Sequence, residues 1–205
     1  LFLRRPISVC DYDETGLTIL YKVVGKGTAQ MAAMRPGQTL DVLTGLGNGY
    51  DIEKCGSRAL LLGGGVGVPP LFGLCKALIN SGRQVRVVLG FNTKDEVFYE
   101  NAFRALGAGV TVATADGSYG VKGFVTDALP DDYDYFFACG PEPMLKAVYE
   151  KVYEEAGISG QMSFEKRMGC GFGACMGCSV RTKTGWKRIC REGPVLGKEE
   201  ILWEG

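Results

Sequence analysis

Three cysteines fall within nine residues near the end of the chain, in the stretch RMGCGFGACMGCSV from Arg167 to Val180. A fourth, Cys190, completes the spacing C-x4-C-x2-C-x11-C. Thiols this close need a tight loop for the first three and a returning segment for the last. Glycine suits such a loop, because it accepts positive φ angles and lets backbone N–H groups point at anionic sulfur. The glycines here are Gly169, Gly171, Gly173 and Gly177.

The candidate metal ligands are Cys170, Cys175, Cys178 and Cys190. The spacing C-x4-C-x2-C is that of plant-type ferredoxins, which hold a [2Fe–2S] cluster with a more distant fourth cysteine. Eleven residues to the fourth cysteine is short, so we expect a cluster outside an ordinary ferredoxin domain. Structural zinc usually takes two separated C-x2-C pairs, and only one such pair is present. Zinc, and free or disulfide-bonded thiols, remain the alternatives.

Composition excludes several classes of function. The 205 residues carry 23 basic and 23 acidic side chains, and a nucleic-acid-binding protein would show a basic excess. Histidine is absent, which excludes histidine bases, histidine zinc ligands and Rieske-type clusters in this chain. The most apolar stretch, residues 59–79, is broken by five glycines and two prolines and predicts a strand, turn and helix, not a membrane span.

The start of the chain, LFLRRPIS, has no initiator methionine and no signal-peptide pattern. We therefore expect a piece of a longer protein. Eight cysteines without a secretion signal indicate a reducing compartment, the cytoplasm, where thiols bind metal or do redox chemistry more often than they form disulfides.

Residues 1–56 alternate apolar and polar positions between turns. Strands are predicted at Ile7–Asp11 and Leu17–Val24, joined by DETG, and TLDVLTGLGNGY predicts a further strand followed by a glycine-rich loop. This is β-barrel-like sequence but too little for a closed barrel, so we expect N-terminal strands to be missing.

From residue 57 onward, apolar runs alternate with helical patterns. The predicted strands are RALLLGG, QVRVVLGF, VTVATAD, YDYFFACG and a last one in GQMSFEKR. The predicted helices are VPPLFGLCKALINSG, DEVFYENAFRALG, a short one in GFVTDAL and the longest in PEPMLKAVYEKVYEEAG. This alternation is typical of a doubly wound parallel sheet. We expect an α/β plus β organisation with an α/β domain at 57–165 and a cluster subdomain at 166–205.

Glycine-rich turns follow the predicted strands. LLLGGGVGVPPL opens a helix, where a backbone stripped of side chains can approach a pyrophosphate, although it lacks the G-x-G-x-x-G pattern. CGPEPML and TADGSYGVKG also follow strands, and open α/β sheets bind ligands at these ends. Tight packing is the alternative for the first loop. RRPIS offers an arginine for phosphate and a serine hydroxyl, and GKGT is either a phosphate loop or a plain turn.

Taken in order, the motifs RRPIS, LYK, GKGT, GLGNG, GGGVGVPPL, ACGPEPML, MGCGFGACMGC and ICREGPV cover essentially the whole chain. Their order resembles that in the electron-transfer subunits of class 1B dihydroorotate dehydrogenases, in the ferredoxin reductase-like superfamily. The cysteine tail is the most specific part of the resemblance. Lys22 stands where an arginine is common.

The resemblance implies a ferredoxin reductase-like fold with a flavin-binding β-barrel at 1–56, an NAD-binding domain at 57–165 and a [2Fe–2S] subdomain at 166–205. The residues implied for FAD are Arg5, Pro6, Ile7, Ser8, Leu20, Tyr21, Lys22, Gly27 and Thr28. Those implied for NAD(H) are Gly63, Gly64, Gly65, Gly67, Cys139, Gly140 and Pro141. The implied cluster ligands are the four cysteines of the tail, and no catalytic acid or base is expected in this chain.

The resemblance also implies a partner, an FMN-containing catalytic subunit that oxidises dihydroorotate to orotate in pyrimidine synthesis. Electrons would run from FMN through the cluster and FAD to NAD⁺, in a heterotetramer of two such chains and two catalytic chains. The alternatives are an electron-transfer subunit of a hydrogenase or of a ferredoxin:NADP oxidoreductase, and a zinc-stabilised module with no enzymatic role. Asp95 and Glu96, after the second strand of the sheet, suggest a preference for NADH, because they would repel a 2′-phosphate.

Overall fold

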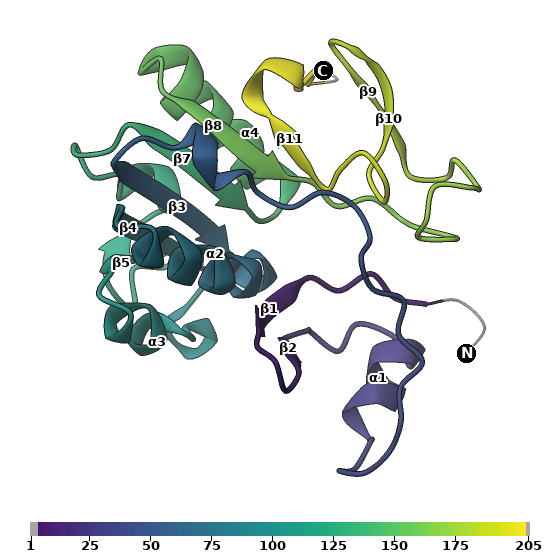
Figure 1. Ribbon diagram of the computed structural model, residues 1–205. Coiled ribbons are helices and arrows are strands. Elements are labelled where there is room, and N and C mark those ends of the chain that lie inside the picture. The colour runs from purple at the N-terminus through teal and green to yellow at the C-terminus, as the bar shows by residue number, and fades with distance from the viewer. Residues whose placement is uncertain (1–3, 204–205) are drawn as a thin grey trace.

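The computed structural model describes residues 4–203. The first residues of the chain, where we expect no signal peptide, lie outside the described residues, as do residues 204–205. Figure 1 shows a central sheet with α2 and α3 on one side and α4 on the other. A small N-terminal unit lies against α2, and the C-terminal tail lies beside the β8 edge of the sheet. Within the described part of the chain, no helix has the length and apolar character needed to cross a membrane.

Among the described residues, the largest sheet has seven strands in the order β11-β8-β7-β3-β4-β5-β6. Every neighbouring pair is parallel except β11 with β8. The strands are β3 (Arg58–Gly64), β4 (Gln84–Phe91), β5 (Gly109–Thr114), β6 (Val121–Lys122), β7 (Tyr135–Cys139), β8 (Ser159–Ser163) and β11 (Val195–Gly197). The strand order reverses between β3 and β7, and doubly wound sheets bind ligands at the carboxyl ends of the strands at such a point.

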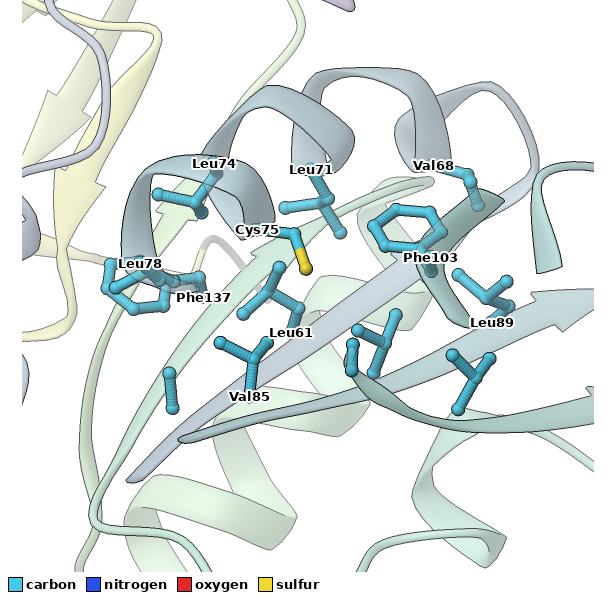
Figure 2. Close-up of a cluster of buried hydrophobic side chains, with 14 of the residues drawn as sticks. Leu61, Val68, Leu71, Leu74, Cys75, Leu78, Val85, Leu89, Phe103 and Phe137 are labelled. Atoms are coloured by element: carbon cyan, nitrogen blue, oxygen red, sulfur yellow. The ribbon is translucent and has the colours of Figure 1, made fainter. Parts of the chain in front are cut away.

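One face of the sheet is covered by α2 (Val68–Asn80). Its prolines fall in the first turn, where backbone N–H groups have no partner within the helix. Its buried side chains recur at i, i+3, i+4 and i+7, which places them on one face; they are Leu71, Leu74, Cys75 and Leu78. Figure 2 shows this face packed on side chains from the strands, including Leu61, Val85, Leu89 and Phe137.

The remaining helices complete the two layers. α3 (Glu100–Ala105) buries Phe103 in the same cluster as α2. α4 (Glu142–Val148) packs on the opposite face, and a π-helical segment, Tyr149–Glu155, continues it. Short 3₁₀ turns lie at Ile52–Lys54, Gly65–Gly67, Lys94–Glu96, Val125–Asp127 and Lys198–Glu200.

The N-terminal unit consists of the antiparallel pair β1 (Val9–Tyr12) and β2 (Leu17–Ile19), followed by α1 (Lys26–Ala32). It contacts the α/β part of the chain through α2. The backbone carbonyl of Cys10 lies against Gly73, so closely that a Cβ at Gly73 would be 2.9 Å from it. Lys76 Nζ forms an ion pair with Asp11 at 3.0 Å. The strand β1 therefore packs against α2, the helix that follows the first glycine-rich loop.

The C-terminal tail forms the hairpin β9 (Ser179–Thr182) and β10 (Gly185–Arg188) and returns to the main sheet as β11. The two-residue strand β6 and this hairpin were not predicted from the sequence. Each is too short, and the tail too irregular, to give a periodic signal.

The predicted doubly wound parallel sheet is confirmed. The strand predicted within residues 39–50 is wrong, because within residues 4–203 Leu40, Val42 and Leu43 lie exposed outside any strand ladder. The second predicted strand ends at Ile19 instead of Val24. The helix predicted in DEVFYENAFRALG starts only after Tyr99, whose φ of 65° is incompatible with a right-handed helix.

Candidate functional site

The four cysteines of the tail form two pairs of thiols. Cys190 lies beside Cys178, whose sulfur accepts a hydrogen bond from the Cys190 N–H at 3.4 Å. Cys170 lies beside Cys175, whose backbone N–H donates a hydrogen bond to the Cys170 sulfur at 3.4 Å. A [2Fe–2S] cluster takes four thiolates shared between two irons, so two pairs fit it. Within residues 4–203, no group of three or more acidic or cysteine side chains is arranged to hold a single metal ion.

Backbone N–H groups point at the first pair. The sulfur of Cys170 accepts hydrogen bonds from Ala174 N at 3.3 Å and from Cys175 N at 3.4 Å. Backbone N–H groups, that of Cys175 foremost and then that of Phe172, lower the pKa of Cys170 to about 6, because they stabilise the thiolate. Positive φ angles at Gly171 and Gly173 fold the loop in this way. The loop is therefore suited to an anionic sulfur ligand before any metal binds.

The second pair is buried. Cys178 and Cys190 are 2% and 5% exposed. Burial raises the pKa of Cys190 to about 11, and the neighbouring Cys178 thiol adds to the shift. Buried thiolates need a compensating positive charge, which a bound metal centre supplies. The pair is thus matched to a metal and not to free thiolates.

The two predicted nucleotide loops meet at the reversal of the sheet. Gly67, at the start of α2, lies against the backbone carbonyl of Cys139 at the end of β7. Gly140 lies close to Gly64, since a Cβ at Gly140 would be 3.2 Å from Gly64 N. The backbone at Gly65 has a φ of 51°. The Met144 side chain covers Gly64 and Gly140, whereas nothing lies within 4 Å of a Cβ at Gly65. The open backbone at Gly65, directly before α2, fits a pyrophosphate at the start of a helix.

Cys139, the last residue of β7, is half-buried. Burial raises the pKa of its thiol to about 11, so it is neutral at physiological pH. Tyr50 donates a hydrogen bond from its hydroxyl to the carbonyl of Ala138 at 2.8 Å. A cleft of about 370 Å³ opens beside this loop. Its lining residues are Gly140, Pro141, Glu142, Leu145, Phe164, Glu165, Lys166 and Arg167.

The third predicted loop, TADGSYGVKG, does not join the other two. It follows β5, which β4 separates from β3. Its polar groups are used within the turn, where Thr114 Oγ1 donates to the Tyr119 carbonyl at 2.7 Å and Ser118 Oγ donates to Asp116 at 2.7 Å. The sequence indicates that this loop follows a strand, but it does not indicate the order of the strands in the sheet. The distance of the loop from the switch point between β3 and β7 could therefore not be predicted.

The structure brings the predicted flavin residues partly together. Arg5 lies over Gly27 at the first turn of α1, and a Cβ at Gly27 would be 2.6 Å from Arg5 Nε. Thr28 Oγ1 accepts hydrogen bonds from Val24 N at 3.0 Å and Gly25 N at 3.2 Å. The Arg5 side chain is exposed, whereas Gly27 and Thr28 beside it are buried, so the arginine is the group here that fits a phosphate. Of the others, Pro6, Ser8 and Lys22 are exposed and Ile7, Leu20 and Tyr21 are half-buried.

One residue with a clear structural role was missed. Asn48, inside the GLGNG motif, bonds to the loop that follows Cys190 (Asn48 N to Gly193 O, 2.6 Å). The motif was noted for its order in the chain, but the sequence does not show which distant segment it contacts. A Gly-Asn-Gly run between the N-terminal unit and β3 was the available signal.

Two family models match the chain. Residues 61–150 match the oxidoreductase NAD-binding domain. Residues 165–202 match the iron–sulfur cluster binding domain of dihydroorotate dehydrogenase B. The first match contains Gly63–Gly67 and Cys139–Pro141, and the second contains the four cysteines of the tail.

Solved structures share the fold. The structure of an NADH-dependent reduced ferredoxin-NADP oxidoreductase superposes with a TM-score of 0.87 and 34% identity, covering 98% of this chain and 75% of that one. A flavohemoglobin from Malassezia yamatoensis, solved with bound FAD and heme, gives a TM-score of 0.57 at 17% identity, covering 72% of this chain and 43% of that one, which shows the fold alone. Fold and site together define an oxidoreductase of the ferredoxin reductase-like class with an iron–sulfur domain at its C-terminus.

A curated relative makes the assignment specific. The dihydroorotate dehydrogenase B (NAD(+)) electron transfer subunit of Geobacillus sp. (strain WCH70) is 46% identical over 210 residues, which cover 98% of this chain and 80% of the relative. The chain belongs to this family of electron transfer subunits. The hydrogenase and zinc-module alternatives gain no support, and the ferredoxin-NADP oxidoreductase is a more distant member of the same superfamily.

Proposed function

We propose that this chain connects an FMN-containing catalytic subunit, which oxidises dihydroorotate to orotate in pyrimidine synthesis, to NAD⁺. The observation that carries the proposal is that one chain combines two thiol pairs in the tail with two glycine-containing loops that meet at the switch point of the sheet. When bound, NAD⁺ supplies hydride chemistry, the [2Fe–2S] cluster single-electron chemistry and FAD both.

The chain's own residues bind and orient these groups. Gly63, Gly64, Gly65 and Gly67, with Cys139, Gly140 and Pro141, are proposed to hold NAD(H) against backbone N–H groups. The proposed FAD residues are Arg5, Pro6, Ile7, Ser8, Leu20, Tyr21, Lys22, Gly27 and Thr28. The proposed cluster ligands are Cys170, Cys175, Cys178 and Cys190.

The proposed division of the chain follows these roles. Residues 1–56 bind flavin, 57–165 bind the nicotinamide nucleotide and 166–205 hold the cluster. The matches at 61–150 and 165–202 support the last two ranges. No side chain of this chain is assigned a proton-transfer role, because the groups that it holds carry the electrons and the hydride.

The partner is proposed to be the catalytic subunit, in a heterotetramer of two chains of each kind. The test mixes the full natural protein with a class 1B catalytic subunit and measures dihydroorotate-dependent NADH formation, with native mass spectrometry for the stoichiometry. We expect NADH to form only when both chains are present. NADH formation at the same rate by the catalytic subunit alone would contradict the proposal.

A further inference from the structure

The motif GLGNG, residues 45–49, lies where the three parts of the chain meet. It leaves the N-terminal unit after α1 and runs beside the C-terminal loops before the chain enters β3, as the blue segment in Figure 1 shows. Its contacts are made with segments more than a hundred residues away in the sequence. No binding or catalytic role assigned above uses this motif.

Asn48 is bonded to the loop that follows the fourth cysteine. Its backbone N–H donates to the Gly193 carbonyl at 2.6 Å, and its own carbonyl accepts from Val195 N at 3.4 Å. Its side-chain Nδ2 donates to the carbonyls of Arg191 at 3.0 Å and Glu192 at 3.3 Å. One residue therefore ties down successive peptide groups directly after Cys190.

Gly47 allows this close approach. Its φ is 65°, and a Cβ there would be 2.5 Å from the Gly193 carbonyl oxygen. The neighbouring Leu46 lies near Gly171, which is in the loop that carries the first cysteine pair. A Cβ added at Gly171 would be 3.9 Å from Leu46 Cδ1. The motif thus touches both loops of the cluster subdomain.

The residues after the motif are bonded to the nucleotide domain. The Tyr50 hydroxyl donates a hydrogen bond to the Ala138 carbonyl on β7. The Tyr50 ring packs edge-on against the Phe137 ring, with 5.5 Å between the ring centroids. The backbone N–H of Asp51 donates to Gln161 Oε1 at 2.9 Å, and Gln161 Nε2 donates back to the Asp51 carbonyl at 2.9 Å. Within six residues the chain is fixed to the cluster loops on one side and to β7 and β8 on the other.

We propose that Asn48 and Gly47 are positioning residues for electron exchange between the flavin and the cluster, and that they act by holding the loop after Cys190 in a fixed place relative to β7. The inference rests on the proposed function, since it assumes both groups are bound. It adds a role that does not involve contact with either nucleotide. Electron exchange depends on the separation and orientation of the carriers, and a rigid junction keeps both constant.

The test compares two pairs of variants in the reconstituted complex. Asn48→Ala removes the side-chain bonds, and Asn101→Ala on α3 is its exposed control. Gly47→Ala forces a Cβ onto the Gly193 carbonyl. Gly45→Ala is its matched control, because Gly45 has nearly the same φ, 69°, but nothing within 4 Å of a Cβ.

Two readouts separate positioning from general damage. Hydrogen–deuterium exchange of residues 189–195 reports on the loop, and rapid-mixing spectroscopy separates flavin reduction by NADH from the later reduction of the cluster. For Asn48→Ala and Gly47→Ala we expect faster exchange in this loop, a cluster-reduction rate at least about fivefold lower, corresponding to about 1 kcal/mol, and flavin reduction unchanged. Both controls should match the wild type.

The outcomes are distinguishable. The inference would be overturned if Asn48→Ala showed the wild-type rates of hydrogen–deuterium exchange in residues 189–195 and of cluster reduction. It would also be overturned if flavin reduction and cluster reduction slowed equally. If Gly47→Ala loses its iron, Asn48→Ala decides the question alone. A wild-type protein that binds no iron, or whose flavin NADH does not reduce, would instead refute the proposed function.

Discussion

Gly67 at the start of α2 packs against the backbone carbonyl of Cys139 at the end of β7, so the loops after two neighbouring parallel strands share one contact. A side chain at Gly67 would occupy the space of that carbonyl. The proposed nucleotide site therefore depends on the absence of a side chain at this position, not only on backbone flexibility.

Gly67→Ala is expected to push the two loops apart and to weaken NADH binding at least about tenfold, or about 1.4 kcal/mol. The φ of Gly67 is −79°, so alanine adds a clash without backbone strain. Isothermal titration of the full natural protein with NADH measures the effect. Gly16→Ala, where nothing lies within 4 Å of the added methyl group, is the control. Wild-type affinity in Gly67→Ala would show that the loops do not bind the nucleotide together.

Gly73→Ala tests the packing of β1 against α2. Alanine favours a helix interior by about 0.5–1 kcal/mol over glycine, but the added Cβ would be 2.9 Å from the Cys10 carbonyl. We expect β1 to shift and flavin reduction by NADH to slow by up to about 100-fold, because misplacement of reacting groups by about 1 Å has effects of that size. Stopped-flow spectroscopy measures the rate, with Asn80→Ala on the same helix as control. An unchanged rate would show that this contact does not set the hydride geometry.

Stability at alkaline pH is expected to depend on Cys75. Burial raises the pKa of this thiol to about 12, from the ordinary value of 9.0 that it has in the unfolded chain. The folded state therefore keeps a proton that the unfolded chain releases, so stability is full below pH 9.0 and falls as the pH rises toward 12. The slope reaches at most about 1.4 kcal/mol per pH unit for one group.

Urea unfolding at about pH 8 and about pH 10.5 checks this. Cys75→Ala should lower stability at both values, because it leaves a small cavity, but should lose less stability between them than the wild type does. The same loss in both proteins would mean that Cys75 does not contribute to the alkaline instability.

A preference for NADH over NADPH is expected from the end of β4. There the Glu96 carboxylate accepts hydrogen bonds from Asn92 N at 3.1 Å and from Asn92 Nδ2 at 2.9 Å, which fixes a negative charge beside the strand end. Such a charge disfavours a 2′-phosphate. Glu96→Gln, alone and together with Asp95→Asn, should bring the dissociation constants for NADH and NADPH closer to each other. Equal affinity of the wild type for both nucleotides would refute this assignment.

Much of the fold could be predicted because the parallel strands have strong local signals. The strands β3 and β7, which form within RALLLGG and YDYFFACG, are buried almost throughout, as their apolar runs indicated, and α2 has the expected spacing of buried side chains. The cysteine spacing likewise identified the metal-binding tail. These features depend on residues that are close in the sequence.

The rest depends on contacts between distant segments. The order of the strands, which separates the loop after β5 from the other two, has no local signal. Neither does the contact between Asn48 and the loop after Cys190. In the N-terminal segment two of the predicted strands form as β1 and β2, which pair with each other. The strand predicted within residues 39–50 was wrong, because an alternating pattern does not show whether a neighbouring strand is there to pair with.

The most direct test of the central claim is the anaerobic visible spectrum of the full natural protein, with iron and flavin quantified before and after NADH is added. The account predicts about two irons and about one FAD per chain, with the absorbance of both groups bleached by NADH. Bound zinc with neither iron nor flavin would contradict it.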